Sequence, residues 1–155
     1  MPLVVPEDWQ VVSGALDPYD ARRPKDAFCD PAAIGPYPVG GEVAYDIDGK
    51  NCLFVTVAQP TRVPVYEGET MLMRLWHFEL IGPTGTATVS VCFDGQPFFY
   101  KELAIPGSSG LDAPVWKAER DMPAGTPVQF HVSNHGSNSY SLIELSVGGP
   151  FPGDP

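Results

Sequence analysis

The sequence predicts an all-β protein, an antiparallel β-sandwich of jelly-roll type with about eight strands. Apolar and polar residues alternate along many short segments, and turn residues separate these segments at intervals of roughly 10–15 residues. The 16 glycines and 18 prolines of this 155-residue chain lie between the apolar segments, where they set turns and end strands. No segment carries a convincing helical period, and the length suits one domain.

The first 42 residues are predicted to form an irregular, proline-rich arm. Proline recurs with aspartate or glycine through residues 17–38 and interrupts every period, although residues 4–5 and 10–12 could each supply a short edge strand. We expect this arm to pack along a sandwich core of residues 43–149. Residues 150–155 are expected to form a disordered tail.

The core shows a regular series of apolar segments separated by turn residues. The candidate strands are residues 42–46, 52–58, 70–81, 86–94, 98–105, 113–118, 127–133 and 139–147. The alternation is clear where Ala87 and Val89 face one side and Thr88 and Ser90 face the other. Residues 70–81 are apolar on both sides, which predicts a central strand whose second face is covered by a loop or by the arm.

The charge of the chain excludes some functions. With 19 acidic against 9 basic residues, the net charge is −10, which repels nucleic acid and disfavours anionic lipid. No apolar run approaches the ~20 residues that span a bilayer. Residues 1–8 lack the basic start and long apolar core of a signal peptide, so an exported form would be the mature chain. The low share of charged residues, 18%, favours an extracellular or periplasmic protein.

The three cysteines differ in their surroundings. Cys29 and Cys52 lie in segments rich in proline and aspartate, whereas Cys92 alternates with serine and threonine in a candidate strand. We predict a Cys29–Cys52 disulfide and a free thiol at Cys92. The alternative is three reduced thiols, because spacing alone does not fix the pairing.

All three histidines lie in two candidate strand segments. His77 belongs to residues 70–81, His131 lies on the polar face of residues 127–133, and His135 follows in a predicted turn. If the two strands pair, the imidazoles could converge and hold a transition metal or a polar ligand. The alternative is hydrogen bonding to loop backbone and cross-strand partners, since the tight spacing of a metal motif is absent.

Two further features predict ligand binding. Trp76 shares a strand face with Arg74, and this pair could form an aromatic platform with a polar neighbour; Trp116 is a second candidate platform. Packing in the core is the alternative for both tryptophans. The segment 134–140 is dense in side chains that donate and accept hydrogen bonds, although the same residue types also close turns. Its candidate ligand contacts are Asn134, His135, Asn138 and Tyr140.

Motifs of cofactor binding and catalysis are weak or absent. Residues 46–51 resemble the start of an acidic calcium loop but lack its distal glutamate, so a hairpin turn is the favoured interpretation. We therefore predict no cofactor, with Ca²⁺ or a transition metal as the alternative. The chain has no nucleophile elbow, P-loop or dinucleotide motif, which favours a non-enzyme and predicts no catalytic residue.

Residues 52–147 resemble the jelly-roll β-sandwiches of carbohydrate-binding modules and secreted lectin-like domains. The resemblance lies in the number of strands, the aromatic content, the many turn residues between the strands and the two segments 76–80 and 130–136. It implies a non-catalytic, extracytoplasmic binding module with carbohydrate as the ligand. The expected ligand contacts are Arg74, Trp76, His77, His131, Asn134, His135, Asn138 and Tyr140.

Two other functions stay open at this point. The first is a metal-binding protein or metal-dependent enzyme that uses His77, His131 and His135. The second is a structural subunit that forms homo-oligomers through its N-terminal arm or through a free edge strand.

Overall fold

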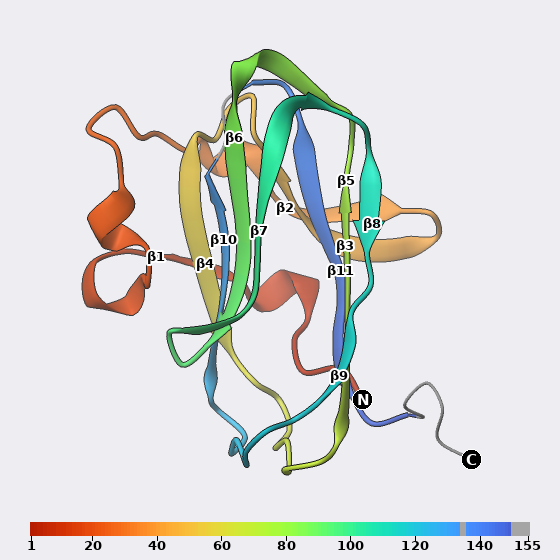
Figure 1. The fold of residues 1–155 in the computed structure, drawn as a ribbon. Coiled ribbons are helices and arrows are strands. Elements are labelled where there is room, and N and C mark those ends of the chain that lie inside the picture. Colours follow the sequence, from red (N-terminus) through yellow and green to blue (C-terminus); the bar gives the residue numbers. More distant parts are fainter. Residues whose placement is uncertain (134–135, 150–155) are drawn as a thin grey trace.

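Two antiparallel β-sheets pack face to face in the computed structural model, which describes residues 1–133 and 136–149 (Figure 1). The five-stranded sheet contains, in spatial order, β1 (Gln10–Val12), β4 (Phe54–Pro60), β10 (Pro127–Ser133), β6 (Leu80–Phe93) and β7 (Gln96–Gly107). The six-stranded sheet contains β2 (Ile34–Val39), β3 (Glu42–Asp48), β11 (Ser139–Val147), β5 (Thr70–His77) and β8 (Gly110–Asp112), with β9 (Val115–Lys117) also paired to β5. The predicted antiparallel sandwich of jelly-roll type is confirmed.

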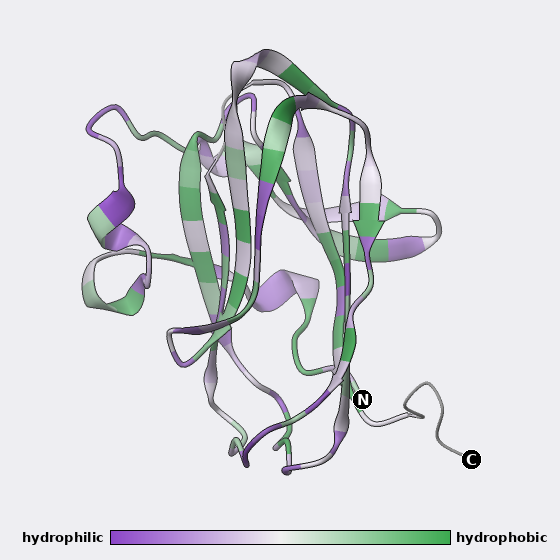
Figure 2. Ribbon diagram, in the orientation of Figure 1, coloured by the Kyte–Doolittle hydropathy of each residue, from purple (hydrophilic) through white to green (hydrophobic). Residues whose placement is uncertain are grey.

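The chain changes sheet at most connections after β3, so strands that are neighbours in sequence mostly face each other across the core. Along each strand, alternate side chains point into this space. In the five-stranded sheet Val57 and Phe130 are fully buried there, and in the six-stranded sheet Met73 and Leu75 meet them. Figure 2 shows the resulting alternation of hydrophobic and hydrophilic residues along the strands. Burial of each such side chain stabilises the fold by about 1.5–3 kcal/mol.

The expected strand at residues 70–81 is two strands in different sheets. β5 ends at His77, and β6 begins at Leu80 in the five-stranded sheet. The exposed ring of Phe78 marks the corner, whereas Leu80 is buried again. Residues 82–85, which separate the candidate strands 70–81 and 86–94, lie inside β6, where the pairing with β7 shifts register. The apolar run thus crosses from one sheet to the other, which alternation alone does not reveal.

The N-terminal arm contributes to both sheets. β1 pairs with β4, and β2 pairs with β3, so each sheet takes an edge strand from the arm. The Leu3 N–H donates to the Leu145 carbonyl at 2.9 Å, which sets the first residues beside β11. Residues 4–5 form no strand, and the arm also contains the 3₁₀ turns η1 (Pro6–Asp8), η2 (Gly14–Leu16), η3 (Asp20–Arg22) and η4 (Pro31–Ala33). Among the described residues, none of the helices has the length and hydrophobicity to traverse a bilayer.

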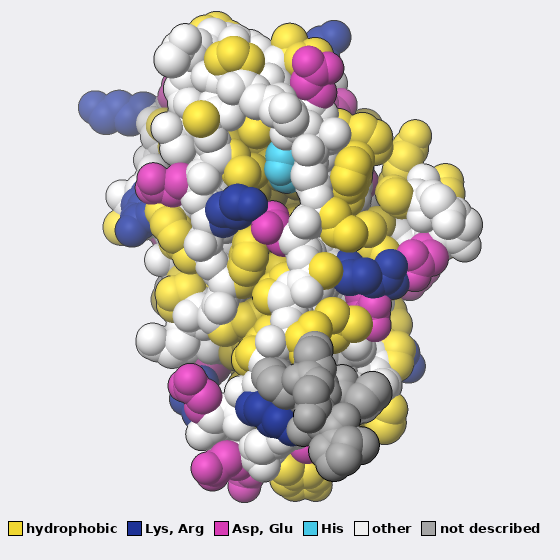
Figure 3. All heavy atoms as spheres, turned by 45° about the vertical axis from the view of Figure 1, so that its right-hand side comes forward, with side chains coloured by type: hydrophobic (Ala, Val, Ile, Leu, Met, Phe, Trp, Pro, Cys, Tyr) yellow, Lys and Arg dark blue, Asp and Glu magenta, His cyan; other side chains and the backbone are white. Residues whose placement is uncertain are grey.

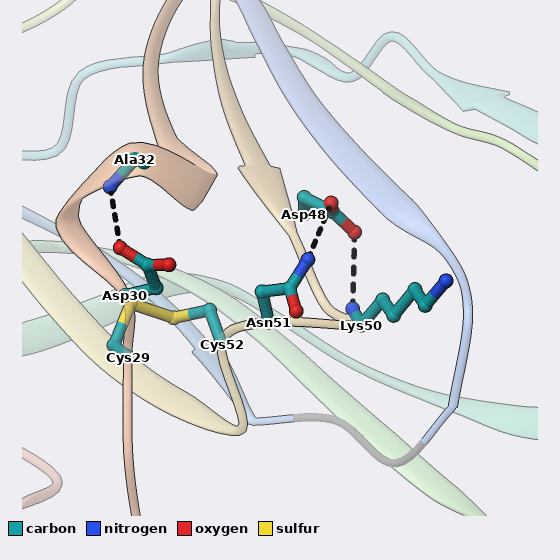
Figure 4. The surroundings of a disulfide bond; sticks show 7 residues. All are labelled: Cys29, Asp30, Ala32, Asp48, Lys50, Asn51 and Cys52. Carbon is teal, nitrogen blue, oxygen red and sulfur yellow. Dashed lines mark hydrogen bonds between the residues drawn. A yellow bond between two sulfur atoms is a disulfide. The ribbon is translucent and has the colours of Figure 1, made fainter.

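The predicted disulfide joins the arm to the connection between β3 and β4 (Figure 4). Cys29 and Cys52 are bonded, and Cys92 is a free, buried cysteine. Close by, Asp48 Oδ1 accepts a hydrogen bond from the Lys50 N–H at 3.0 Å and closes the turn after β3. The carboxylate of Asp46, within β3, accepts from Ser141 Oγ at 2.7 Å, so the carboxylates at the end of β3 already have protein partners. The turn is not that of the expected hairpin, because β3 and β4 belong to different sheets.

Side chains close the side of the sandwich where β7 faces β8 and β9. The Lys101 ammonium lies 2.9 Å from Asp112 Oδ1 and links the two sheets. Below this ion pair the Phe98 and Trp116 rings pack with centroids 4.6 Å apart. Trp116, which the sequence suggests as a second aromatic platform for a ligand, therefore packs against the opposite sheet. This side comes forward in Figure 3.

Candidate functional site

One row of residues runs across the outer face of the six-stranded sheet. Residues that pair directly in neighbouring strands share a face of the sheet. The row consists of Gly35 in β2, Asp46 in β3, Ser141 in β11, Trp76 in β5 and Leu111 in β8. Since Met73 and Leu75 point into the core, Arg74 and Trp76 point outward, and neither is covered completely. The cover predicted over the second face of this strand is therefore only partial.

Trp76 forms the centre of an apolar platform on this face. Its ring meets Phe78 edge-on, with centroids 5.9 Å apart and planes inclined by 85°. The flanking Leu111 and Phe78 side chains are 55% and 43% exposed. Figure 3 shows hydrophobic side chains gathered over the visible part of β5, β8 and β11. A partly exposed aromatic ring with exposed apolar neighbours can stack on a flat, weakly polar ligand surface.

Arg74, two residues before Trp76 on the same face, is held by two carboxylates. Its Nε donates to Glu144 Oε2 at 2.6 Å, while Nη1 and Nη2 donate to the two oxygens of Glu42 at 2.9 and 2.6 Å. Ser146 Oγ donates to the other oxygen of Glu144 at 2.8 Å. The hydrogen bond from Arg74 lowers the pKa of Glu42 below its ordinary value. This charged cluster, made of Glu42, Arg74, Glu144 and Ser146, thus carries two carboxylates for one guanidinium.

Asp46 adds a third carboxylate to the face, in the same row as Trp76. Burial raises its pKa, the hydrogen bond from Ser141 lowers it, and the charge of Asp48 raises it again. The net direction is upward. The outer face therefore offers several oxygen acceptors beside an apolar ring, which is the usual composition of a small-molecule site.

The face deepens into a hollow of about 980 Å³ next to the charged cluster. The pairing of β3 with β11 ends at Leu142, and the register with β5 shifts there because Ile143 is an extra residue. The first residues of the arm then take the place of β3 beside β11. The walls of the hollow include Val4, Tyr66, Leu72, Arg74, Ile143 and Glu144. The charged cluster therefore forms part of its polar wall.

Only part of the predicted ligand set lies on this face. Arg74 and Trp76 are adjacent there, as their spacing predicts. His77 and Tyr140 are opposite each other in β5 and β11 and point into the interior, where both are buried. Asn138 is buried too and donates from Nδ2 to the Tyr140 hydroxyl at 3.1 Å. Asn134 and His135 lie outside the described residues.

The structure does not bring His77 and His131 together. β5 and β10 belong to different sheets, so the pairing on which a shared site depended does not occur. The His77 Nδ1 lies 3.0 Å from the carbonyl of Phe78, and its ring is buried between the sheets. His131 lies on the outer face of the other sheet. Across residues 1–133 and 136–149, no three His, Cys, Asp or Glu side chains are grouped so as to hold a metal ion.

His131 instead anchors the arm. Its ring stacks on Tyr19 with centroids 4.3 Å apart, and its Nδ1 lies 2.8 Å from Thr56 Oγ1. Thr56 in turn donates to Asp17 Oδ1 at 2.7 Å. Burial, followed by the charges of Arg22 and Arg23, lowers the pKa of His131 to about 3. The side chain is therefore neutral over the physiological range and serves packing.

Sequence reasoning missed most of the polar residues of this face. Glu42 and Glu144 bond to Arg74 from positions 32 and 70 residues away along the chain. Asp46 and Leu111 reach the Trp76 row only through the strand register. The sequence indicates only that each of these residues lies in or beside a segment in which apolar and polar residues alternate. Which of them meet on one face depends on strand order, which local pattern does not encode.

No family model matches the chain, and no curated protein matches it in sequence. Among solved structures, a carbohydrate-binding module of CBM28, specific for non-crystalline cellulose, has a TM-score of 0.51 at 6% identity, covering 76% of this chain and 82% of its own. "Family 16 Carbohydrate Binding Module-2" has a TM-score of 0.47 at 11% identity, covering 76% and 86%. The N-terminal cellulose-binding domain of β-1,4-glucanase C from Cellulomonas fimi has 0.46 at 14%, covering 79% and 93%.

The predicted resemblance to the β-sandwiches of carbohydrate-binding modules is confirmed at the level of the fold. At such low identities the likeness extends to the fold alone, because one fold carries many functions.

Proposed function

We propose that this chain is a non-catalytic carbohydrate-binding module that holds a glycan on the outer face of its six-stranded sheet. The observation that carries the proposal is the partly exposed setting of Trp76, in one row with Leu111, Ser141 and Asp46 and two residues from Arg74. An aromatic ring beside carboxylates is the combination that a sugar requires, since a sugar ring has an apolar face and a rim of hydroxyls.

The chemistry of these side chains gives each a separate role in binding a sugar. The indole of Trp76 supplies the stacking surface, and the half-exposed Phe78 and Leu111 extend it. An ionised carboxylate offers about four lone-pair sites, so Glu42 and Glu144 keep acceptors for sugar hydroxyls after they bind Arg74. Arg74 fixes both carboxylates in place, which reduces the entropy lost when a ligand binds.

An extracytoplasmic location belongs to the same proposal. Disulfides persist in oxidising compartments and are rare in the cytosol, and Cys29 is bonded to Cys52. A polysaccharide ligand would also be met outside the cell.

Affinity electrophoresis against a panel of soluble neutral polysaccharides tests the proposal, followed by calorimetry with an oligosaccharide of the one that binds best. We expect Trp76→Ala to weaken binding by about 2 kcal/mol, roughly 30-fold, as for a central aromatic contact. The matched control is Phe28→Ala, which removes an aromatic ring that is 55% exposed in the arm. No binding to any neutral polysaccharide, or equal loss in the two variants, would contradict the proposal.

A further inference from the structure

Each of the three nitrogens of the Arg74 guanidinium already donates a hydrogen bond within the protein, to Glu42 or to Glu144. Its Nε and both terminal nitrogens donate to carboxylates, bidentately to Glu42 and singly to Glu144. From this arrangement we infer that the proposed glycan site selects neutral polysaccharides and rejects chains that carry uronic acids. The inference rests on the proposed function and names the class of ligand for that same site.

An arginine on a binding face is ordinarily the strongest attractor for a carboxylate ligand, because its planar fork matches two oxygens at once. Here Glu42 takes that fork with contacts of 2.9 and 2.6 Å. A uronate would have to displace an intramolecular carboxylate that is tethered to the same face. The intramolecular partner has the entropic advantage, since its ordering was completed on folding.

The local charge also opposes an acidic ligand. The charged cluster has two carboxylates for one guanidinium, and Asp46 lies in the adjacent row. The chain as a whole carries −10. Distant charges are screened beyond about 8 Å at physiological ionic strength, so the cluster itself decides the selection under these conditions. The same carboxylates accept hydrogen bonds from uncharged hydroxyls, so they favour a neutral glycan.

Glu42 and Glu144 are therefore the residues that determine selectivity. Replacing both with glutamine preserves their shape but removes two negative charges, so Arg74 becomes an uncompensated cation beside Trp76. The bidentate acceptance by Glu42 is lost as well, because a glutamine side chain has one acceptor oxygen and its amide nitrogen only donates. The variant Glu42→Gln/Glu144→Gln should consequently gain affinity for acidic polysaccharides.

The experiment compares the best neutral polysaccharide of the panel with polygalacturonate, by affinity electrophoresis at low salt and at 150 mM salt. The wild type is expected to bind only the neutral chain. The double variant is expected to bind polygalacturonate at least tenfold more tightly than the wild type does. Adding Arg74→Gln to the double variant should abolish this gain. The control Glu67→Gln/Glu119→Gln changes the net charge equally at two exposed positions that belong neither to the cluster nor to the lining of the hollow, and it should not bind polygalacturonate.

The outcomes separate this inference from the proposed function. If the wild type binds no neutral polysaccharide, the proposed function fails. If the wild type binds the neutral chain and also polygalacturonate, or if the folded double variant still rejects polygalacturonate, only the charge selection fails. Thermal melts identify folded variants. Should the double variant not fold, Glu42→Gln alone carries the test, because that carboxylate is 49% exposed and its loss should produce a smaller gain of the same sign.

Discussion

His131 shows how one side chain acquires a defined proton position from its neighbours. The hydroxyl of Thr56 has a single proton, which it donates to the carboxylate of Asp17. Thr56 Oγ1 must then accept from His131, so the neutral imidazole carries its proton on Nδ1. With Tyr19 stacked on the ring, this chain of bonds fixes residues 17–19 of the arm on the five-stranded sheet.

This arrangement predicts acid sensitivity with a definite sign. The pKa of His131 is about 3 in the folded protein, against 6.5 for an ordinary histidine. Between these values the unfolded chain binds a proton that the folded protein does not bind. The free energy of unfolding should therefore fall as the pH drops from about 6.5 toward 3, by up to about 1.4 kcal/mol for each pH unit.

Urea unfolding at pH 7, 5.5 and 4 measures the effect. The wild type should lose more stability between pH 7 and 4 than His131→Gln does, whatever the stability of that variant at pH 7. Equal pH slopes in the two proteins would show that His131 does not contribute. The comparison cancels the titration of carboxylates that both proteins share, such as Glu42.

At the scale of strands, alternation was a good guide wherever one face of a strand meets the core. It predicts β10 at its observed bounds and β11 likewise. It does not predict β2, because Pro36 and Pro38 interrupt the segment; an edge strand tolerates proline on its unpaired side. It merges the corner between β5 and β6, because apolar residues continue on both sides of the corner and no glycine or proline lies between the two strands.

Gly136, in the connection between β10 and β11, offers a test of close packing against the start of β6. Gly136 has a φ of +120°, and a Cβ atom there would lie 2.2 Å from the Ile81 carbonyl oxygen. We expect Gly136→Ala to destabilise the protein by more than about 2 kcal/mol, because backbone must move in addition to the strain of the left-handed conformation. Urea unfolding of Gly125→Ala is the control, since that glycine has a φ of +91° and open space around it. Similar losses in both variants would mean that the contact with Ile81 is relieved easily.

At the scale of the whole molecule, the candidate site is assembled from strands that are far apart in the chain. Arg74 and Trp76 were predictable as neighbours because one strand carries both. Glu42, Glu144 and Asp46 were not, because their meeting depends on the spatial order β3–β11–β5. The expected histidine site failed for the same reason, since two alternating segments give no indication of whether they share a sheet.

The disulfide affects the molecule as a whole, because it closes a loop with a sequence separation of 23 residues in the unfolded chain. Loop-closure entropy predicts that Cys29→Ala/Cys52→Ala lowers the free energy of unfolding by about 3 kcal/mol. Urea unfolding measures this loss, and the reduced wild type should behave like the variant. Glycan binding by the folded variant should be unchanged, since Trp76 and the charged cluster lie on other strands. A loss below about 1 kcal/mol would show that the unfolded chain is already compact there.

The two long sides of the sandwich are joined by bonds of very different strength. On the side of β2 and β4 a disulfide joins the arm to the β3–β4 connection, whereas on the other side the side-chain contacts between the sheets include the Lys101–Asp112 ion pair of β7 and β8 and the Phe98–Trp116 ring contact of β7 and β9. Partial unfolding should therefore begin along β7, β8 and β9, and the backbone amides there should exchange with solvent before those of β4. Because β8 pairs with the strand that carries Trp76, such breathing would loosen the binding platform first at Leu111.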